Sequence, residues 1–188
     1  MPKHESFIKI TLKLLGVCIG LVVSGMLIYY LIGRGVADVD DVSDLEKRRQ
    51  IETMYDGYKQ SFPQVMEISA EHALELAKED KAVFVDVREP KEQAVSMLPG
   101  AITEKDFLEN PEAYKGRMII SYCTISYRSG KLAERLQKKG IQVMNLRGGI
   151  LAWLHAGGKV YKDGEPVMRV HVYGKKWDLA PSGYETVQ

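Results

Sequence analysis

Short apolar runs alternate with amphipathic stretches over much of the chain. Three of these runs have the length and composition of buried strands: residues 82–87, 117–122 and 141–146. Residues 69–80, before the first run, and 129–140, before the third, place apolar side chains on one helical face, with Ser69 as an N-cap and Gly140 as a stop. This alternation predicts an α/β fold with a parallel sheet flanked by helices.

The longest apolar run lies near the N-terminus. Residues 14–32 carry no charge over 19 positions, and a helix of that length spans about 30 Å, the thickness of bilayer hydrocarbon. A cleaved signal peptide is the alternative, with residues 35–37 as its cleavage site, but its apolar region is usually shorter, about 7–15 residues. We therefore predict one transmembrane helix over 14–33, after a short flank over 1–13.

Charged residues around this apolar run indicate its orientation. Lys9 and Lys13 lie just before it, whereas Arg34 alone is close to its other end. Because positive charge favours the cytoplasmic side, the N-terminus is expected inside the cell and the rest of the chain outside. The predicted location is a bacterial inner membrane, crossed once, with the following domain on the periplasmic side.

The segment over 34–64 is predicted to be a linker that contains an amphipathic helix. Ser43 and Glu46 fit a capping box at the start of that helix, and it is expected to end at Gly57, Ser61 and Pro63. Apolar side chains keep helical spacing on one face: Ile51, Met54, Tyr55 and Tyr58. We interpret the opposite, charged face as solvated surface.

The folded domain is predicted over 65–158, and residues 159–188 form a C-terminal extension with no helical pattern. Asp163 and Gly164 are typical of a hairpin turn, and an apolar strand follows them. Aromatic and imidazole side chains in this extension are either a ligand surface or the half-buried face of a strand that packs the tail down: His171, Tyr173 and Trp177. The packing interpretation is the favoured one.

Charge and cysteine content exclude several function classes. The 188-residue chain has a formal net charge of +1, so no basic field indicates a nucleic-acid partner. Its two cysteines, Cys18 and Cys123, are far apart, and no Cys/His pairs have zinc spacing, so no metal is expected. Cys18 falls in the apolar N-terminal run. If Cys123 has a function, it acts as a lone thiol.

Cys123 falls at the carboxyl end of a predicted central strand, where ligands bind in open α/β sheets. The loop that follows leads into a helix near Ser129, whose free backbone N–H groups and dipole favour an anion. Arg128 adds a permanent positive charge. These surroundings favour the thiolate over the thiol. The alternative is a small, buried cysteine at a strand end with no chemical role.

Four stretches together resemble the rhodanese sulfurtransferase family, in its single-domain form, over about 66–158. They are DVREPKE (86–92), MLPGAI (97–102), YCTISYRSG (122–130) and LRGGILAW (146–153). The resemblance implies a catalytic Cys123 and Arg128. It implies a substrate-binding loop made of Thr124, Ile125, Ser126, Tyr127 and Ser129, with supporting roles for Asp86, Arg88 and Glu92.

The two acids Asp86 and Glu92 are each expected to anchor Arg128 or a loop amide, or else to be ordinary solvated side chains. The chain departs from the family at Met97, where many members have histidine, and at Ser126, where the loop often has glycine. If that glycine is left-handed, serine at this position has a moderate backbone cost.

The length of the loop distinguishes two chemistries. Four residues separate Cys123 from Arg128, which gives the six-residue loop that the resemblance associates with sulfur transfer. Related phosphatases and arsenate reductases have one more residue and a wider cradle, so phosphatase activity is disfavoured. Ile125 and Tyr127 also make the loop more apolar than a small dianion such as thiosulfate needs.

The resemblance implies that Cys123 takes a sulfane sulfur from thiosulfate or a persulfide and passes it to a thiol, cyanide or a protein acceptor, without a cofactor. This two-step covalent scheme predicts ping-pong kinetics. Because Cys18 is expected in the membrane, no resolving cysteine is available. The alternative is a membrane-tethered binding or redox-sensing module without turnover.

Overall fold

The computed structural model describes Met26 and residues 43–188. The predicted flank over 1–13 lies outside the described residues, as does Cys18 and all of the predicted span over 14–33 apart from Met26. Within the described part of the chain, no helix is both long and apolar enough to cross a membrane.

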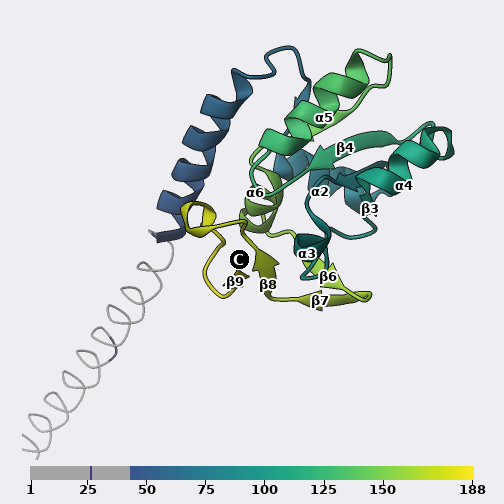
Figure 1. Ribbon diagram of the computed structural model, residues 1–188. Coiled ribbons are helices and arrows are strands. Elements are labelled where there is room, and N and C mark those ends of the chain that lie inside the picture. The colour runs from purple at the N-terminus through teal and green to yellow at the C-terminus, as the bar shows by residue number, and fades with distance from the viewer. Residues whose placement is uncertain (1–25, 27–42) are drawn as a thin grey trace, which may run out of the picture. The chain divides into compact units, whose positions relative to one another are not determined.

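A five-stranded parallel sheet forms the centre of the domain, with the strand order β1-β5-β4-β2-β3 (Figure 1). Its strands are β1 (Glu67–Ile68), β2 (Ala82–Asp86), β3 (Ile102–Thr103), β4 (Met118–Tyr122) and β5 (Met144–Leu146). Phe84 of β2 is in register with Ile120 of β4. The predicted parallel α/β sheet is therefore confirmed, and each of the three predicted strands overlaps an observed one.

Helices cover both faces of this sheet. They are α2 (Ala70–Lys78), α3 (Pro90–Gln93), α4 (Glu104–Glu109), α5 (Tyr127–Gln137) and α6 (Gly149–His155), with a short 3-10 turn η1 (Pro111–Tyr114). Phe84 and Ile120 pack on one face with α2 and α6, whereas Val83 and Ile119 pack on the other with α4 and α5. Adjacent strand residues point to opposite faces, so one short apolar strand supplies both cores.

Residues 43–59 form one helix, which is blue in Figure 1 and packs against the domain. Ile51 and Tyr55 are almost completely buried, so the predicted face of this helix is a packing face. The helix ends at residue 59, within the group of residues expected to end it, although Gly57 itself lies inside the last helical turn. Glycine costs a helix about 1 kcal/mol, and burial of two large side chains offsets that amount.

The charged face of this helix is mostly exposed, as the sequence indicates, but two of its acids also contact the domain. Arg147, just after β5, pairs with Glu52 and Asp56 of the helix, and with Glu67 of β1 at 3.2 Å. The Tyr55 hydroxyl donates to the same Glu67 carboxylate at 2.5 Å. These contacts bind the helix over residues 43–59 to the edge of the sheet.

The C-terminal extension contains β6 (Val160–Lys162), β7 (Glu165–Val167), β8 (Arg169–His171), the 3-10 turn η2 (Lys175–Trp177) and β9 (Glu185–Val187). The hairpin predicted at Asp163 and Gly164 is confirmed, since β6 and β7 pair across that turn. The predicted absence of helix holds apart from η2. β9 pairs in parallel with β8, which returns the end of the chain to the domain.

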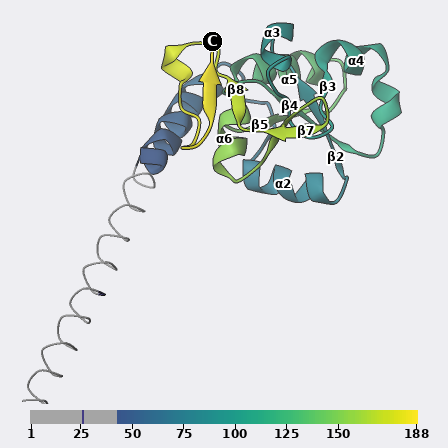
Figure 2. The ribbon, with the colours of Figure 1, turned by 90° about the horizontal axis from the view of Figure 1, so that it is seen from below.

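The C-terminal extension contacts the start of the helix over residues 43–59. The Asp44 carboxylate accepts hydrogen bonds from the Ser182 backbone N–H and hydroxyl at 3.0 and 3.1 Å. Lys47 donates to the carbonyl oxygen of Ala180 at 2.9 Å. Figures 1 and 2 show the yellow C-terminal segment beside the blue helix from two directions. We call this group of contacts the terminal clamp.

Candidate functional site

Cys123 follows β4 directly and begins a loop that runs into α5. The Cys123 carbonyl accepts a hydrogen bond from the N–H of Ile150 at 2.9 Å, and the N–H of Leu151 donates to the Thr124 carbonyl at 3.4 Å. Gly149 adopts a φ of +60°, and a Cβ there would collide with both carbonyl groups. The glycine before Ile150 therefore lets the first turn of α6 hold the loop from below.

Ser126 is the last loop residue before α5 and adopts the left-handed conformation, with a φ of 82°. This is the conformation for which the family's glycine is suited, and it costs serine about 1–2 kcal/mol. Its hydroxyl donates to the carbonyl of Leu146, and its carbonyl accepts from the Asn145 side-chain amide at 3.1 Å. These two buried hydrogen bonds offset the backbone cost.

Ser129 lies in the first turn of α5, with its hydroxyl oxygen 3.7 Å from the Cys123 sulfur. The same hydroxyl donates to the side-chain carbonyl of Asn145 at 2.7 Å. A hydroxyl has one proton, so the shorter contact with Asn145 takes it and the sulfur receives only the weaker contact. The sequence reasoning missed Asn145, although a polar residue inside an apolar strand run was a usable signal.

Arg128 points along the loop and forms two hydrogen bonds with Glu92, at 2.6 and 2.8 Å. The Thr124 hydroxyl lies within reach of both charged groups, at 3.3 Å from Arg128 and 3.2 Å from Glu92. Glu92 is fully buried. Burial would raise the pKa of Glu92, but hydrogen bonds from Arg128 and the Glu89 backbone outweigh it and lower that pKa.

The same contacts keep Arg128 charged. Burial would lower the pKa of Arg128, but the Glu92 hydrogen bonds and the charge of the Cys123 sulfur raise it instead. Of the two expected anchors, Glu92 therefore contacts Arg128. The expectation that Glu92 is an ordinary solvated acid is wrong, because its side chain is enclosed by α3 and the loop.

Asp86 does not contact Arg128 and instead forms a separate buried cluster. Its carboxylate accepts a hydrogen bond from the Arg88 backbone N–H at 2.9 Å, others from the Arg88 guanidinium, of which the shortest is 2.7 Å, and one from the Tyr122 hydroxyl at 2.5 Å. Burial raises the pKa of Tyr122, and the charge of Asp86 adds to that effect, so the phenol stays protonated and donates. Arg88 also donates to the carbonyl of Ser96 at 2.6 Å.

This cluster fixes the end of β2 to the turn that precedes β3. Tyr122 accepts a hydrogen bond from the Leu98 N–H at 3.2 Å, which extends the cluster along that turn. Met97, where the family often has histidine, pairs through its backbone with Tyr161 at 2.8 and 2.9 Å. Met97 does not line the pocket beside Cys123, so this departure from the family leaves that pocket unchanged.

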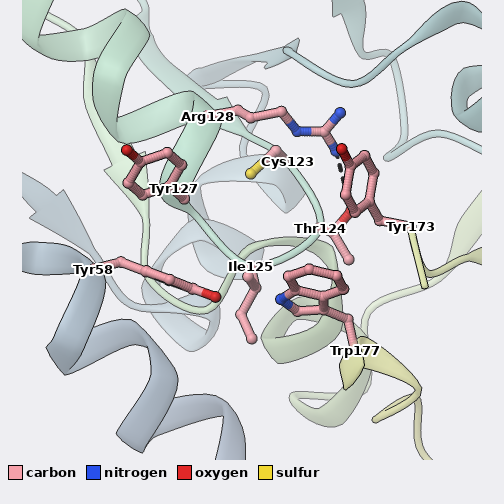
Figure 3. A pocket seen from close by; sticks show the side chains of 8 residues that line it. All are labelled: Tyr58, Cys123, Thr124, Ile125, Tyr127, Arg128, Tyr173 and Trp177. Carbon is pink, nitrogen blue, oxygen red and sulfur yellow. Dashed lines mark hydrogen bonds between the residues drawn. The ribbon is translucent and has the colours of Figure 1, made fainter. Parts of the chain in front are cut away.

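Cys123 lies at the floor of a pocket of about 290 Å³. The residue is 2% exposed, and Figure 3 shows its sulfur among the side chains that line the pocket. The loop contributes Cys123, Thr124, Ile125, Tyr127 and Arg128, and three more side chains come from elsewhere: Tyr58, Tyr173 and Trp177. Ser126 and Ser129 support the loop from behind rather than line the pocket.

The three side chains from outside the loop change two expectations. Tyr58 belongs to the helix over residues 43–59, which the sequence indicates only as a linker helix. Tyr173 and Trp177 belong to the extension, where the favoured interpretation was packing alone; both line the pocket, whereas His171 is buried beneath them. Within the described residues, no cluster of three or more side chains has the composition of a metal site.

Comparisons with known proteins agree with this geometry. A family profile described as the rhodanese-like domain matches residues 69–156. An Allochromatium vinosum protein named sulfurtransferase is 36% identical over 86 residues, which cover 44% of this chain and 80% of that protein. A Bacillus subtilis protein provisionally named sulfurtransferase YtwF is 30% identical over 94 residues, which cover 48% of this chain and 91% of that protein.

A third relative, the uncharacterized protein slr1261 of Synechocystis sp., is 33% identical over 87 residues, which cover 44% of this chain. The chain spans about half the length of that relative, 49%. All three similarities extend over a part of the chain comparable in length with the matched domain, which holds the sheet, the Cys123 loop and α6. On these matches, the chain belongs to the rhodanese-like domain family.

Proposed function

We propose that this chain is a sulfurtransferase, which moves a sulfane sulfur from a small donor to a thiophilic acceptor through a persulfide on Cys123. The observation that carries the proposal is the position of Cys123, at the floor of a pocket where β4 ends and α5 begins. Family membership and two relatives named as sulfurtransferases support the same activity.

In the first half-reaction, the Cys123 thiolate attacks the outer sulfur of the donor. With thiosulfate, a bond forms between Sγ and that sulfur, the S–S bond of thiosulfate breaks, and its electron pair leaves with sulfite. The thiolate and the thiosulfate dianion thus give a persulfide anion and a sulfite dianion. In the second half-reaction, cyanide or a thiolate attacks the outer sulfur and restores the Cys123 thiolate.

The start of α5 supplies the stabilising groups for the persulfide. The first hydrogen bond of this helix runs from the Gly130 N–H to the Ser126 carbonyl, so the N–H groups before Gly130 have no partner within the helix. These groups and the helix dipole stabilise the negative charge on the outer sulfur. Arg128 fixes the shape of the loop and adds positive charge beside it.

The proposal includes a membrane location. The uncharged run over 14–33 anchors the chain in a bacterial inner membrane, and the lysines before it direct the folded unit to the periplasmic side. The acceptor is then a small thiol, cyanide or a protein thiol on that side of the membrane.

Mass spectrometry of the intact full-length protein tests the activity. After exposure to a sulfane-sulfur donor, Cys123 is expected to gain the mass of one sulfur atom, and cyanide is expected to remove it as thiocyanate. The matched variant Cys123→Ser keeps the size of the side chain and is expected to gain nothing.

A binding or redox-sensing module gives a different result in the same experiment. If Cys123 stays unmodified with every donor, or if a loaded sulfur cannot be discharged by any thiol or cyanide, the sulfurtransferase proposal is wrong. A phosphate ester offered to the same protein is expected to remain intact, because the six-residue loop is short for a tetrahedral oxyanion.

A further inference from the structure

The only cation among the residues that line the Cys123 pocket already has partners. Arg128 forms two hydrogen bonds with Glu92, and a third reaches the Thr124 hydroxyl. One face of its guanidinium is covered by the ring of Tyr173, with 5.0 Å between the guanidinium carbon and the ring centroid. A sulfonate group entering the pocket would therefore find no uncommitted cation among its lining residues.

Four aromatic side chains surround the remaining space. Tyr58 and Tyr127 form one pair, with their ring centroids 5.4 Å apart, and Tyr173 and Trp177 form a second pair at 5.3 Å. Ile125 lines the same pocket, in which Figure 3 shows the rings around the Cys123 sulfur. Such a lining favours an apolar or aromatic ligand. The volume of the pocket, about 290 Å³, fits a small organic molecule.

The backbone at Tyr173 indicates that this aromatic wall is held in place. Tyr173 has a φ of +57°, a left-handed conformation that is rare for an aromatic residue, and its side chain is 53% exposed. Its N–H donates to the buried imidazole of His171 at 3.1 Å, which fixes this turn. The turn keeps a large exposed ring over Arg128 at a backbone cost of about 1–2 kcal/mol.

We propose that the donor is an organic hydropersulfide whose sulfane sulfur is carried on an apolar or aromatic group, and that Tyr58, Tyr173 and Trp177 select it over small anionic donors. This inference rests on the proposed sulfur transfer. All three residues lie outside the 69–156 stretch that matches the family profile, so the selectivity belongs to this chain's own flanking segments.

With this donor, atoms and electrons balance in the step that loads sulfur onto Cys123. The Cys123 thiolate attacks the outer sulfur of R–S–SH, a new Sγ–S bond forms, and the S–S bond of the donor breaks. The electron pair leaves with R–S⁻, and the proton stays on the transferred sulfur or moves to the departing thiolate. The sulfane sulfur keeps its oxidation state, so no external oxidant or reductant takes part.

Two donors with the same S–S bond but different R groups test the proposal in the full-length protein. Benzyl hydropersulfide and carboxymethyl hydropersulfide, each generated in situ, are compared by the rate at which Cys123 gains sulfur. The wild-type protein is expected to prefer the benzyl donor by at least about tenfold in kcat/KM. Trp177→Ala and Tyr173→Ala are each expected to lower that ratio about tenfold, because the benzyl group loses part of its aromatic contact surface.

Tyr114→Ala is the matched control, because Tyr114 packs against Phe107 and does not line the pocket. This control is expected to keep the wild-type ratio. Equal loading by both donors in the wild-type protein, or a ratio that the Trp177 and Tyr173 variants leave unchanged, overturns the selectivity but not the sulfur transfer. Loading by neither donor contradicts the sulfur transfer itself, and the inference with it.

Discussion

Glu92 holds three groups of the loop region at once, because its carboxylate contacts Arg128, the Thr124 hydroxyl and the Glu89 N–H. The lowered pKa of Glu92 links this network to stability. In the folded protein the carboxylate stays charged to a lower pH than in the unfolded chain, so the unfolded state binds more protons below a pH of about 4.3. The stability from Glu92 is therefore present above that pH and lost as pH falls through the folded pKa.

Glu92→Gln removes this contribution while keeping the size of the side chain. At pH 7 we expect the variant to be less stable by about 2 kcal/mol, because Arg128 loses a charged hydrogen-bond partner. The difference is expected to shrink as pH falls below about 4.3, because the unfolded chain then takes up a proton that the folded carboxylate, with its lowered pKa, does not. Urea unfolding of both proteins at pH 7, 5 and 3.5 measures the difference, and a constant gap over this range would contradict the prediction.

The chemistry at this scale could be read from the sequence in part. Cys123 and Arg128 stand in a contiguous loop, and Glu92 lies in a stretch that resembles its family counterpart. Asn145 stands out as a polar residue in an apolar strand run, but its contacts with Ser126 and Ser129 depend on how that strand lies beside α5. Asp86 and Glu92 both carry a carboxylate, and only the folded structure shows which of the two acids reaches Arg128.

The helix α6 covers the sheet and also positions the Cys123 loop, because N–H groups in its first turn donate hydrogen bonds to two carbonyl groups of that loop. A side chain at Gly149 would displace this loop. Gly149→Ala is expected to cost about 3 kcal/mol of unfolding free energy, from overpacking and from the left-handed backbone, and to slow loading of Cys123.

Gly140→Ala is the control for the backbone cost alone. Gly140 has a similar positive φ, +80°, but open space where the Cβ would lie. We expect it to lose about 1 kcal/mol of stability and to keep the wild-type rate of sulfur loading. Thermal or urea unfolding together with the Cys123 loading assay separates the two variants. If both variants load sulfur equally fast, α6 does not position the loop.

The main elements followed from apolar periodicity, and the exceptions have physical causes. β1 and β3 have two residues each, which is too short for any period to appear in the sequence. Gly57 was expected to help end a helix, but Tyr55 is buried against the domain on the turn before it, and that packing carries the helix past the glycine. The intrinsic helix propensity of a residue decides where a helix ends only if that part of the chain has few tertiary contacts.

At the scale of the whole molecule, residues 44–188 form one compact unit that contains both hydrophobic clusters. Removal of residues 1–42 is therefore expected to leave the free energy of unfolding and the sulfur-loading rate unchanged, while it releases the protein from membranes. Membrane fractionation of cells that express each form measures the location. The double variant Leu21→Asp, Val22→Asp in the full chain is expected to weaken membrane association as well.

Full-length protein found in the soluble fraction, or a shortened form that still sediments with membranes, would contradict the proposed anchor. If the mass of the wild-type protein shows that the mature chain begins near residue 38, a cleaved signal peptide is indicated instead.

The pocket walls are the part of the molecule that the sequence could not supply. Tyr58 and Trp177 are far from Cys123 along the chain, and no local pattern states that the two flanking segments meet at one place. Their meeting depends on the terminal clamp and on contacts with the sheet edge, which are long-range in sequence.

The terminal clamp has a practical consequence for anyone who isolates the matched domain alone. A fragment trimmed to the family boundaries, 69–156, would keep Cys123 but lose every residue of the clamp, together with the segments that the clamp joins. The pocket beside Cys123 would then lose Tyr58 on one side and Tyr173 and Trp177 on the other, and would be open to solvent there. We expect such a fragment to show a weaker preference between sulfur donors than the intact chain.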